Sequence, residues 1–215
     1  MTLRPASYAL AGAALVLAVL FVRQRRRPMM HPPPLTFLFE NPIAEAFVGK
    51  GLLIERLNPA PGMRVLDAGC GPGRLTIPLA GAVGPDGEVV ALDGQPAMLA
   101  KLEERLRERG VTNVRPLRAR LGEGELAQGS FDRILLPMVL GEVRDRRAAM
   151  RELYAALAPG GVLSITEVFG DPDYRRPATV RREAEEAGFR LVERFGRFPA
   201  YTLNFEKVGT PRSRP

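Results

Sequence analysis

Two carboxylates and a glycine-rich stretch are the residues of this chain best suited to hold a small ligand. Asp67 follows a short apolar run, and Gly69-Cys70-Gly71-Pro72-Gly73 comes directly after it. Glycines let the backbone adopt positive φ and approach a ligand closely, and a helix starting after the turn adds unpaired N–H groups. Asp93 ends the next apolar run, a placement that suits hydrogen bonds to ribose hydroxyls. These residues predict a nucleoside-binding site in an α/β domain.

The spacing of the glycines distinguishes two kinds of nucleotide site. A dinucleotide fingerprint, G-x-G-x-x-G, would place its third glycine at position 74, where this chain has Arg74. The glycines run instead as G-x-G-x-G from Gly69. An NAD(P)-dependent reductase is therefore the less favoured enzyme. The alternative to any ligand-binding function is a doubly wound domain whose glycine turn binds no ligand.

Asp67 and the glycine turn resemble motif I of the class I S-adenosylmethionine (SAM)-dependent methyltransferases. Asp93 is similar to that family's acidic residue after strand two, and Leu157-Ala158-Pro159-Gly160-Gly161-Val162-Leu163 to its turn into strand five. The resemblance covers residues 45–207 and implies SAM as the cofactor, with its methionine part held by Asp67 and the glycines and its ribose by Asp93. The expected cofactor-binding residues are Asp67, Gly69, Cys70, Gly71, Gly73, Asp93, Gly94, Arg120, Leu121, Pro137 and Met138.

The chain departs from the family after the third expected strand. The resemblance implies an Asp there that contacts the adenine amino group, and Arg120 stands at the matching position. Backbone groups near Leu121 or the side chain of Glu123 are the alternatives for recognising adenine. Cys70 is expected to be a small, buried and inert side chain of the cofactor turn.

The predicted fold is α/β: a doubly wound, seven-stranded, mostly parallel sheet of Rossmann-like type, with an N-terminal transmembrane helix. In such sheets ligands bind beyond the carboxyl ends of the strands, at the switch point between the first and fourth strands. Residues 137–142 should therefore line the junction of cofactor and acceptor, and Asp145 should cap the next helix. The expected strands are residues 64–66, 88–92, 114–117, 131–136, 162–168, 190–195 and 201–207.

Glu142 and Glu167 are the candidate catalytic residues, because each lies near the carboxyl end of an expected strand. A general base is needed only if the methyl acceptor must lose a proton, as with a hydroxyl, a thiol or an activated carbon. A role at the surface or in pairing with a helix end is the alternative for each. His31 is the only histidine and Cys70 the only cysteine, so a multi-histidine metal site and an intrachain disulfide are excluded.

An uncharged stretch, residues 6–22, precedes the basic residues 23–27. As a helix it would rise about 25 Å, at the short end of what spans a bilayer. The charge follows the apolar run, which favours a single-pass anchor over a cleaved signal peptide and places the rest on the cytoplasmic side. Tight surface association is the alternative. The expected domains are a membrane anchor with basic flank (1–27), a proline-rich linker (28–36), a methyltransferase domain (37–207) and a disordered basic tail (208–215).

The positive charge lies at the ends of the chain. Lys and Arg number 31 and Asp and Glu 24, but residues 31–206 hold 23 basic and 24 acidic side chains. No nucleic-acid partner is therefore expected. Residues 139–143 and 164–167 resemble the group with ubiquinone/menaquinone C-methyltransferases and bacterial phospholipid N-methyltransferases. With a membrane anchor, a lipid, a quinone or polyprenyl compound, or a hydrophobic thiol is the favoured acceptor. A non-catalytic SAM- or nucleoside-binding regulator of a membrane partner is the alternative function.

Overall fold

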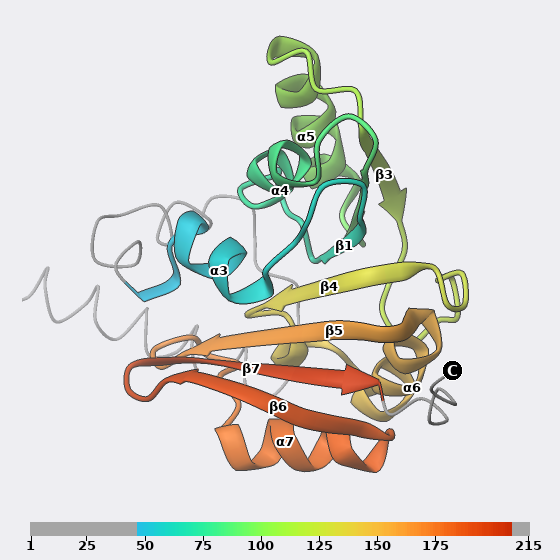
Figure 1. Ribbon diagram of the computed structural model, residues 1–215. Helices are drawn as coiled ribbons and strands as arrows, with labels where there is room; N and C mark the ends of the chain where they lie inside the picture. The colour runs from blue at the N-terminus through green and yellow to red at the C-terminus, as the bar shows by residue number, and fades with distance from the viewer. Residues whose placement is uncertain (1–46, 208–215) are drawn as a thin grey trace, which may run out of the picture.

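In the computed structural model, which describes residues 47–207, a seven-stranded sheet lies between two layers of helices (Figure 1). The strand order is β3-β2-β1-β4-β5-β7-β6, and only β7 runs antiparallel to its neighbours. The predicted doubly wound, mostly parallel sheet is thus confirmed. The strands are β1 (Arg64–Ala68), β2 (Glu88–Asp93), β3 (Val114–Arg118), β4 (Phe131–Pro137), β5 (Leu157–Val168), β6 (Phe189–Gly196) and β7 (Ala200–Lys207).

Helices cover both faces of the sheet and bury an apolar stripe against it. One face packs against α3 (Lys50–Leu57), α4 (Thr76–Val83) and α5 (Pro96–Glu108), and the other against α6 (Arg146–Ala156) and α7 (Pro177–Glu186). Strands β1, β2 and β4 are central, which explains their nearly continuous apolar sequences. The predicted cap of α6 is confirmed, since the Asp145 carboxylate accepts a hydrogen bond from the Ala148 N–H at 2.9 Å.

Strand β5 begins earlier than its sequence predicts. The Pro-Gly-Gly stretch, expected as a turn before residue 162, lies inside β5. Phe131 pairs with Leu157 and Arg133 with Val162, so a short piece of β4 faces a longer piece of β5. The extra residues of β5 form a bulge, which a sequence pattern cannot distinguish from a turn because both use proline and glycine.

The described residues include no helix long and apolar enough to cross a membrane. The longest of these helices, α5, has 13 residues; its rise is about 20 Å, against a hydrocarbon core of about 30 Å. Residues 6–22, on which the predicted transmembrane helix depended, lie outside the described residues, as do the linker and the tail. Because the described residues include no such helix, the predictions of a transmembrane helix and of a single-pass membrane location are corrected. The fold that the structure describes is the sheet with its helices.

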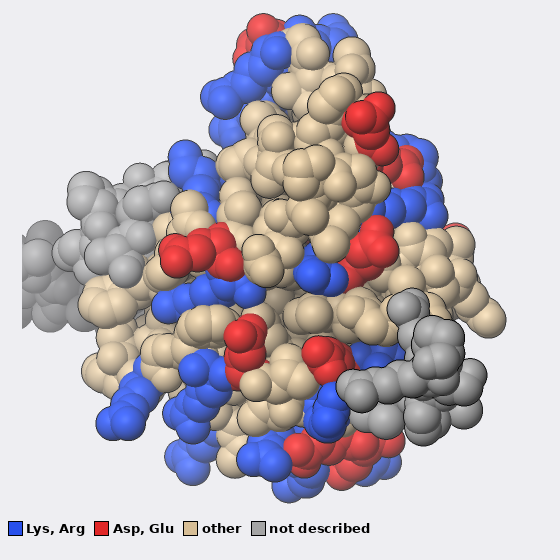
Figure 2. Space-filling view, in the orientation of Figure 1, with Lys and Arg blue, Asp and Glu red and all other residues tan. Residues whose placement is uncertain are grey.

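The charged side chains of the domain are mixed. On the face shown in Figure 2, Lys and Arg are interspersed with Asp and Glu, and neither sign covers the face alone. Several charged side chains of the described residues form ion pairs, such as Arg181 with Glu185 at 2.7 Å and Arg190 with Glu206 at 3.0 Å. Exposed pairs of this kind contribute little to stability, about 0 to 1 kcal/mol each. The organisation of the site therefore comes from buried groups.

Candidate functional site

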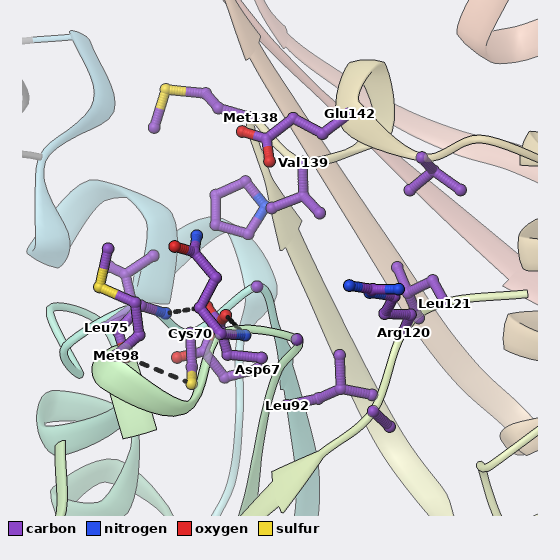
Figure 3. Close-up of a pocket in the computed structure, with 18 of the residues that line it drawn as sticks. Asp67, Cys70, Leu75, Leu92, Met98, Arg120, Leu121, Met138, Val139 and Glu142 are labelled. Atoms are coloured by element: carbon purple, nitrogen blue, oxygen red, sulfur yellow. Dashed lines mark hydrogen bonds between the residues drawn. The ribbon is translucent and has the colours of Figure 1, made fainter. Parts of the chain in front are cut away.

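A cavity of about 540 Å³ opens at the carboxyl ends of β1, β2 and β4 (Figure 3). Figure 3 shows Leu75 and Met98 on one side of this space, Arg120 and Leu121 on the other, and Glu142 at its rim. The structure brings most of the predicted site residues together here. Those that line the cavity are Asp67, Gly69, Cys70, Gly71, Asp93, Gly94, Arg120, Leu121, Pro137, Met138 and Glu142. Gly73 and Glu167 do not line it.

The glycine turn folds against the ends of two strands. The N–H groups of Gly69 and Cys70 both donate to the carbonyl of Leu92, at 2.8 and 2.9 Å. Gly69 has φ +79°, and a Cβ there would overlap the side chain of Val139. Gly71 has φ +53° with no atom within 4 Å of the position of a Cβ, so its backbone borders open space. The turn therefore presents bare backbone to the cavity.

Gly73 has a packing role that its sequence context did not reveal. Its φ is +89°, and a Cβ would lie 2.5 Å from a methyl carbon of Leu102. Leu102 is fully buried on α5. The third glycine thus lets α5 pack close to the turn and does not face the ligand space.

Asp93 ties the glycine turn to the end of β2. Its two carboxylate oxygens accept the N–H of Gly71 at 2.9 Å and the N–H of Gln95 at 2.8 Å. Burial raises the pKa of Asp93, and these two hydrogen bonds oppose that rise. Each carboxylate oxygen has two lone pairs, so Asp93 keeps acceptor capacity for hydroxyl groups of a ligand.

Asp67 is a buried carboxylate whose neighbours only partly compensate the cost of burying its charge. Its side chain is 1% exposed, and one oxygen accepts the Thr76 hydroxyl at 2.6 Å. Burial raises the pKa of Asp67 to about 6, although Thr76 and the charge of Arg74 oppose the rise. A cationic group in the cavity would stabilise the charged form. Asp67 is thus suited to pair with an ammonium group.

Arg120 reaches into the cavity from the loop after β3, as Figure 3 shows. Its side chain is exposed and makes no hydrogen bond or ion pair with another residue of the range 47–207. Ala119 and Leu121, on either side of it, are buried. A guanidinium group in this position can stack on an aromatic ring or donate to ring nitrogens.

The two candidate catalytic carboxylates lie in different surroundings, and only Glu142 lines the cavity. Glu142 ends the short helix η2 (Leu140–Glu142) and lines the cavity. Glu167 is 1% exposed and points with Leu163 and Ile165 to the face that α6 and α7 cover. Burial raises the pKa of Glu167 to about 8. The prediction placed Glu167 at the correct end of β5, but the alternation of side chains turns it away from the cavity.

Several cavity residues have no signal in the sequence. Asp171 comes from the loop after β5, Arg144 from the loop after η2, and Gln95 and Met98 from the start of α5. Met138 was expected at the site, but its φ of +55° was not. Such a backbone conformation is uncommon for a residue other than glycine and often marks a functional site. No group of His, Cys, Asp and Glu in the described range is arranged to hold a metal ion.

Comparison with known proteins agrees with this geometry. Residues 65–161 match the family model described as a methyltransferase domain. The demethylmenaquinone methyltransferase of Geobacillus sp. (strain WCH70) is 34% identical over 108 residues, which are 50% of this chain and 46% of that protein. The ubiquinone/menaquinone biosynthesis C-methyltransferase UbiE of Shewanella oneidensis is 34% identical over 148 residues, which are 68% of this chain and 57% of that protein. The chain thus spans about half the length of these curated relatives.

A solved structure shares the fold. The crystal structure of a SAM-dependent methyltransferase from Aquifex aeolicus superposes with a TM-score of 0.76 at 21% identity, covering 83% of this chain and 100% of that one. At this identity the match shows the architecture alone. The resemblance first given by Asp67, the glycine turn and Asp93 is confirmed by the family model and the sequence relatives together.

Proposed function

We propose that this chain, whose residues 65–161 form a methyltransferase domain of the class I SAM-dependent type, transfers a methyl group from SAM to a small lipophilic acceptor of the quinone class. One observation carries the proposal. The same cavity holds Asp67, Asp93 and the open backbone at Gly71 together with the carboxylate of Glu142. The acceptor class follows the names of the relatives, which are menaquinone and ubiquinone/menaquinone methyltransferases.

The residues present fit SAM. Asp67 is a buried carboxylate, and a cationic partner such as the cofactor's ammonium group would stabilise its charged form, which burial disfavours. Asp93 retains acceptor capacity for the ribose hydroxyls, and the bare backbone at Gly71 leaves room beside it. SAM, when bound, supplies an electrophilic methyl group on a sulfonium sulfur. The protein therefore needs to align the acceptor and exclude water more than to activate the donor.

The acceptor side of the cavity combines an apolar wall with one carboxylate. Pro137, Met138, Val139 and Val143 come from the end of β4 and from η2 and its flanks, and Glu142 lies among them. A ring carbon becomes a better nucleophile when a neighbouring hydroxyl loses its proton. We assign Glu142 to accept that proton, because it is the carboxylate of this wall. We do not assign this role to Glu167, which is 1% exposed and does not line the cavity.

The direct test offers the purified full chain methyl-labelled SAM and a chemically reduced naphthoquinone that lacks its ring methyl group. The proposal expects a product one methyl group heavier and an equal amount of S-adenosylhomocysteine. A phospholipid and a hydrophobic thiol serve as competing acceptors. Binding of S-adenosylhomocysteine without methylation of any of the three would contradict the proposal and favour a non-catalytic SAM-binding protein.

A further inference from the structure

An exposed group of aromatic side chains lies beside the cavity. Phe169 is 59% exposed and Phe198 75% exposed, and their ring centroids are 5.1 Å apart. Tyr174 packs edge-on against Phe169 with a centroid distance of 5.8 Å. We call these three residues the aromatic shelf. Neighbouring exposed aromatic rings are costly to leave in water and mark a binding surface.

The aromatic shelf and one wall of the cavity lie at the same end of β5. Met138 lines the cavity and packs in the same apolar cluster as Val168 and Ala200. Val168 and Ala200 are register partners on β5 and β7, and the next residue on β5, Phe169, donates its N–H to the Pro199 carbonyl at 2.6 Å. Met138, whose N–H donates to the Thr166 carbonyl, and Phe169 therefore both lie at the carboxyl end of β5. Figure 3 shows Met138 pointing away from Asp67 and Cys70, toward the outside of the site.

The loop that carries two of the three shelf residues, Phe169 and Tyr174, is held in place. The N–H of Tyr174 donates to the Asp171 carbonyl at 3.1 Å, and Asp171 itself lines the cavity. The ring of Tyr174 also packs edge-on against the buried ring of Tyr201, at 6.1 Å. A preformed surface loses little conformational entropy when a ligand binds. The shelf is thus ready to accept a flexible chain.

We propose that the aromatic shelf binds the hydrocarbon side chain of the acceptor while the acceptor's ring lies in the cavity. This inference rests on the proposed function. The cavity of about 540 Å³ has to hold both the cofactor and the ring, so a long side chain has to leave it. Met138 in the cavity wall and the exposed rings of Phe169 and Phe198 offer the chain apolar contact. Flat aromatic faces suit an unsaturated chain of isoprenoid type, whose branched carbons bury well against rings.

The test compares two reduced naphthoquinones that differ only in their side chain. One has no chain and the other has a chain of two isoprene units. For the parent protein, the chain-bearing acceptor should have a KM at least tenfold lower. The Phe169→Ala/Phe198→Ala double variant should lose most of this difference, with the KM of the chainless acceptor and the affinity for S-adenosylhomocysteine unchanged. Val192→Ala is the control, since Val192 is an exposed apolar residue on β6.

Each other outcome overturns the inference. A double variant that keeps the tenfold preference shows that the chain binds elsewhere. If the parent forms a dimer and the double variant is a monomer that keeps the preference, the shelf is a contact between copies. If the parent methylates neither acceptor, the proposed function itself fails. If the parent methylates both acceptors with equal KM, the proposed function stands and only the inference about the shelf is overturned. Phe198→Ala alone repeats the comparison if the double variant melts at a lower temperature, because the Phe198 ring is mostly outside the core.

Discussion

Glu167 and Tyr201 hold the two backbone polar groups of one residue, Arg175. The Glu167 carboxylate accepts the Arg175 N–H at 3.1 Å, and the Tyr201 hydroxyl donates to the Arg175 carbonyl at 2.6 Å. The two are register partners on β5 and β7, and both are almost fully buried. We call this pair of hydrogen bonds to Arg175 the clamp. The loop of residues 169–174 leads directly to Arg175. Glu167 is therefore better described as a positioning residue for the loop than as a general base.

The clamp predicts an unusual dependence of stability on pH. Burial, with smaller effects of Asp171 and Asp173, raises the pKa of Glu167 from 4.5 to about 8, and the Arg175 N–H and charge oppose the rise. Between these pH values the folded state binds more protons than the unfolded state. The free energy of unfolding should therefore fall as pH rises from about 5 to 8, by up to about 1 kcal/mol per pH unit.

Glu167→Gln should remove this part of the pH dependence while its amide oxygen still accepts the Arg175 N–H. Urea unfolding at pH 6 and pH 9 measures the effect, with Glu125→Gln at an exposed position as the control. Equal losses of stability in the parent and in Glu167→Gln between the two pH values would contradict the burial argument.

Asp67→Asn should weaken binding of S-adenosylhomocysteine roughly 10- to 100-fold, because a charge-assisted hydrogen bond is worth about 1.5–3 kcal/mol. The parent's affinity should also fall as pH drops through about 6, where Asp67 becomes protonated. Isothermal titration at pH 5.5 and pH 8 measures both effects. Asp86→Asn, in an exposed turn, is the control. If the Asp67→Asn variant keeps the parent's affinity and pH profile, Asp67 does not contact the ligand.

Gly69→Ala should destabilise the fold more than Gly71→Ala. Both positions have positive φ, which costs about 1 kcal/mol for alanine, but only at Gly69 does the new methyl group meet Val139. A second substitution, Val139→Ala, should restore part of the stability that Gly69→Ala loses. The part of the loss caused by the positive φ should remain. Thermal melts of the parent and of these three variants give the comparison. Equal melting temperatures for Gly69→Ala and Gly71→Ala would contradict the close approach of Val139.

Glu142→Gln should lower kcat for the quinol acceptor by about 100-fold or more, the usual contribution of a general base. The affinity for S-adenosylhomocysteine should change less than twofold. Glu123→Gln is a matched control, because Glu123 lines the same cavity from the loop after β3. A kcat within threefold of the parent in Glu142→Gln would remove Glu142 from the proposed mechanism.

Arg120→Ala should reduce the affinity for S-adenosylhomocysteine about three- to tenfold, since a stacked guanidinium contributes about 1 kcal/mol. Adenosine alone should show the same reduction, which separates contact with the base from contact with the methionine part. Arg118→Ala serves as the comparison, because Arg118 is also exposed but lies outside the cavity. If the two variants bind alike, Arg120 does not recognise the base.

The sequence predicts the backbone of this site better than its side chains. Continuous apolar runs identify the central strands, and the carboxylates at their ends mark the edge where the cavity opens. The direction of a side chain depends on strand register, and the pairing of Leu157 with Phe131 depends on a bulge that no local pattern defines. For that reason Glu167 was expected in the cavity, whereas its carboxylate accepts the Arg175 N–H and does not line the cavity.

Loops and packing account for the other differences. Asp171 enters the cavity only because residues 169–174 fold back beside η2, where Gly141 allows close contact with Asp173. The same turn glycines serve different purposes: Gly71 borders open space, whereas Gly73 makes room for Leu102. One-letter patterns treat these glycines alike, and only tertiary contacts separate their roles.

The reversed direction of β7 has a practical consequence. This strand starts with Ala200 beside Val168, at the cavity edge of the sheet, and ends with Lys207, whose ammonium group bonds the Leu157 carbonyl where β5 begins. Eight residues of strand separate the two edges by about 25 Å. An affinity tag, a fluorophore or a solid support attached after Lys207 would therefore leave the mouth of the cavity free, so that poorly water-miscible compounds can be screened on immobilised protein.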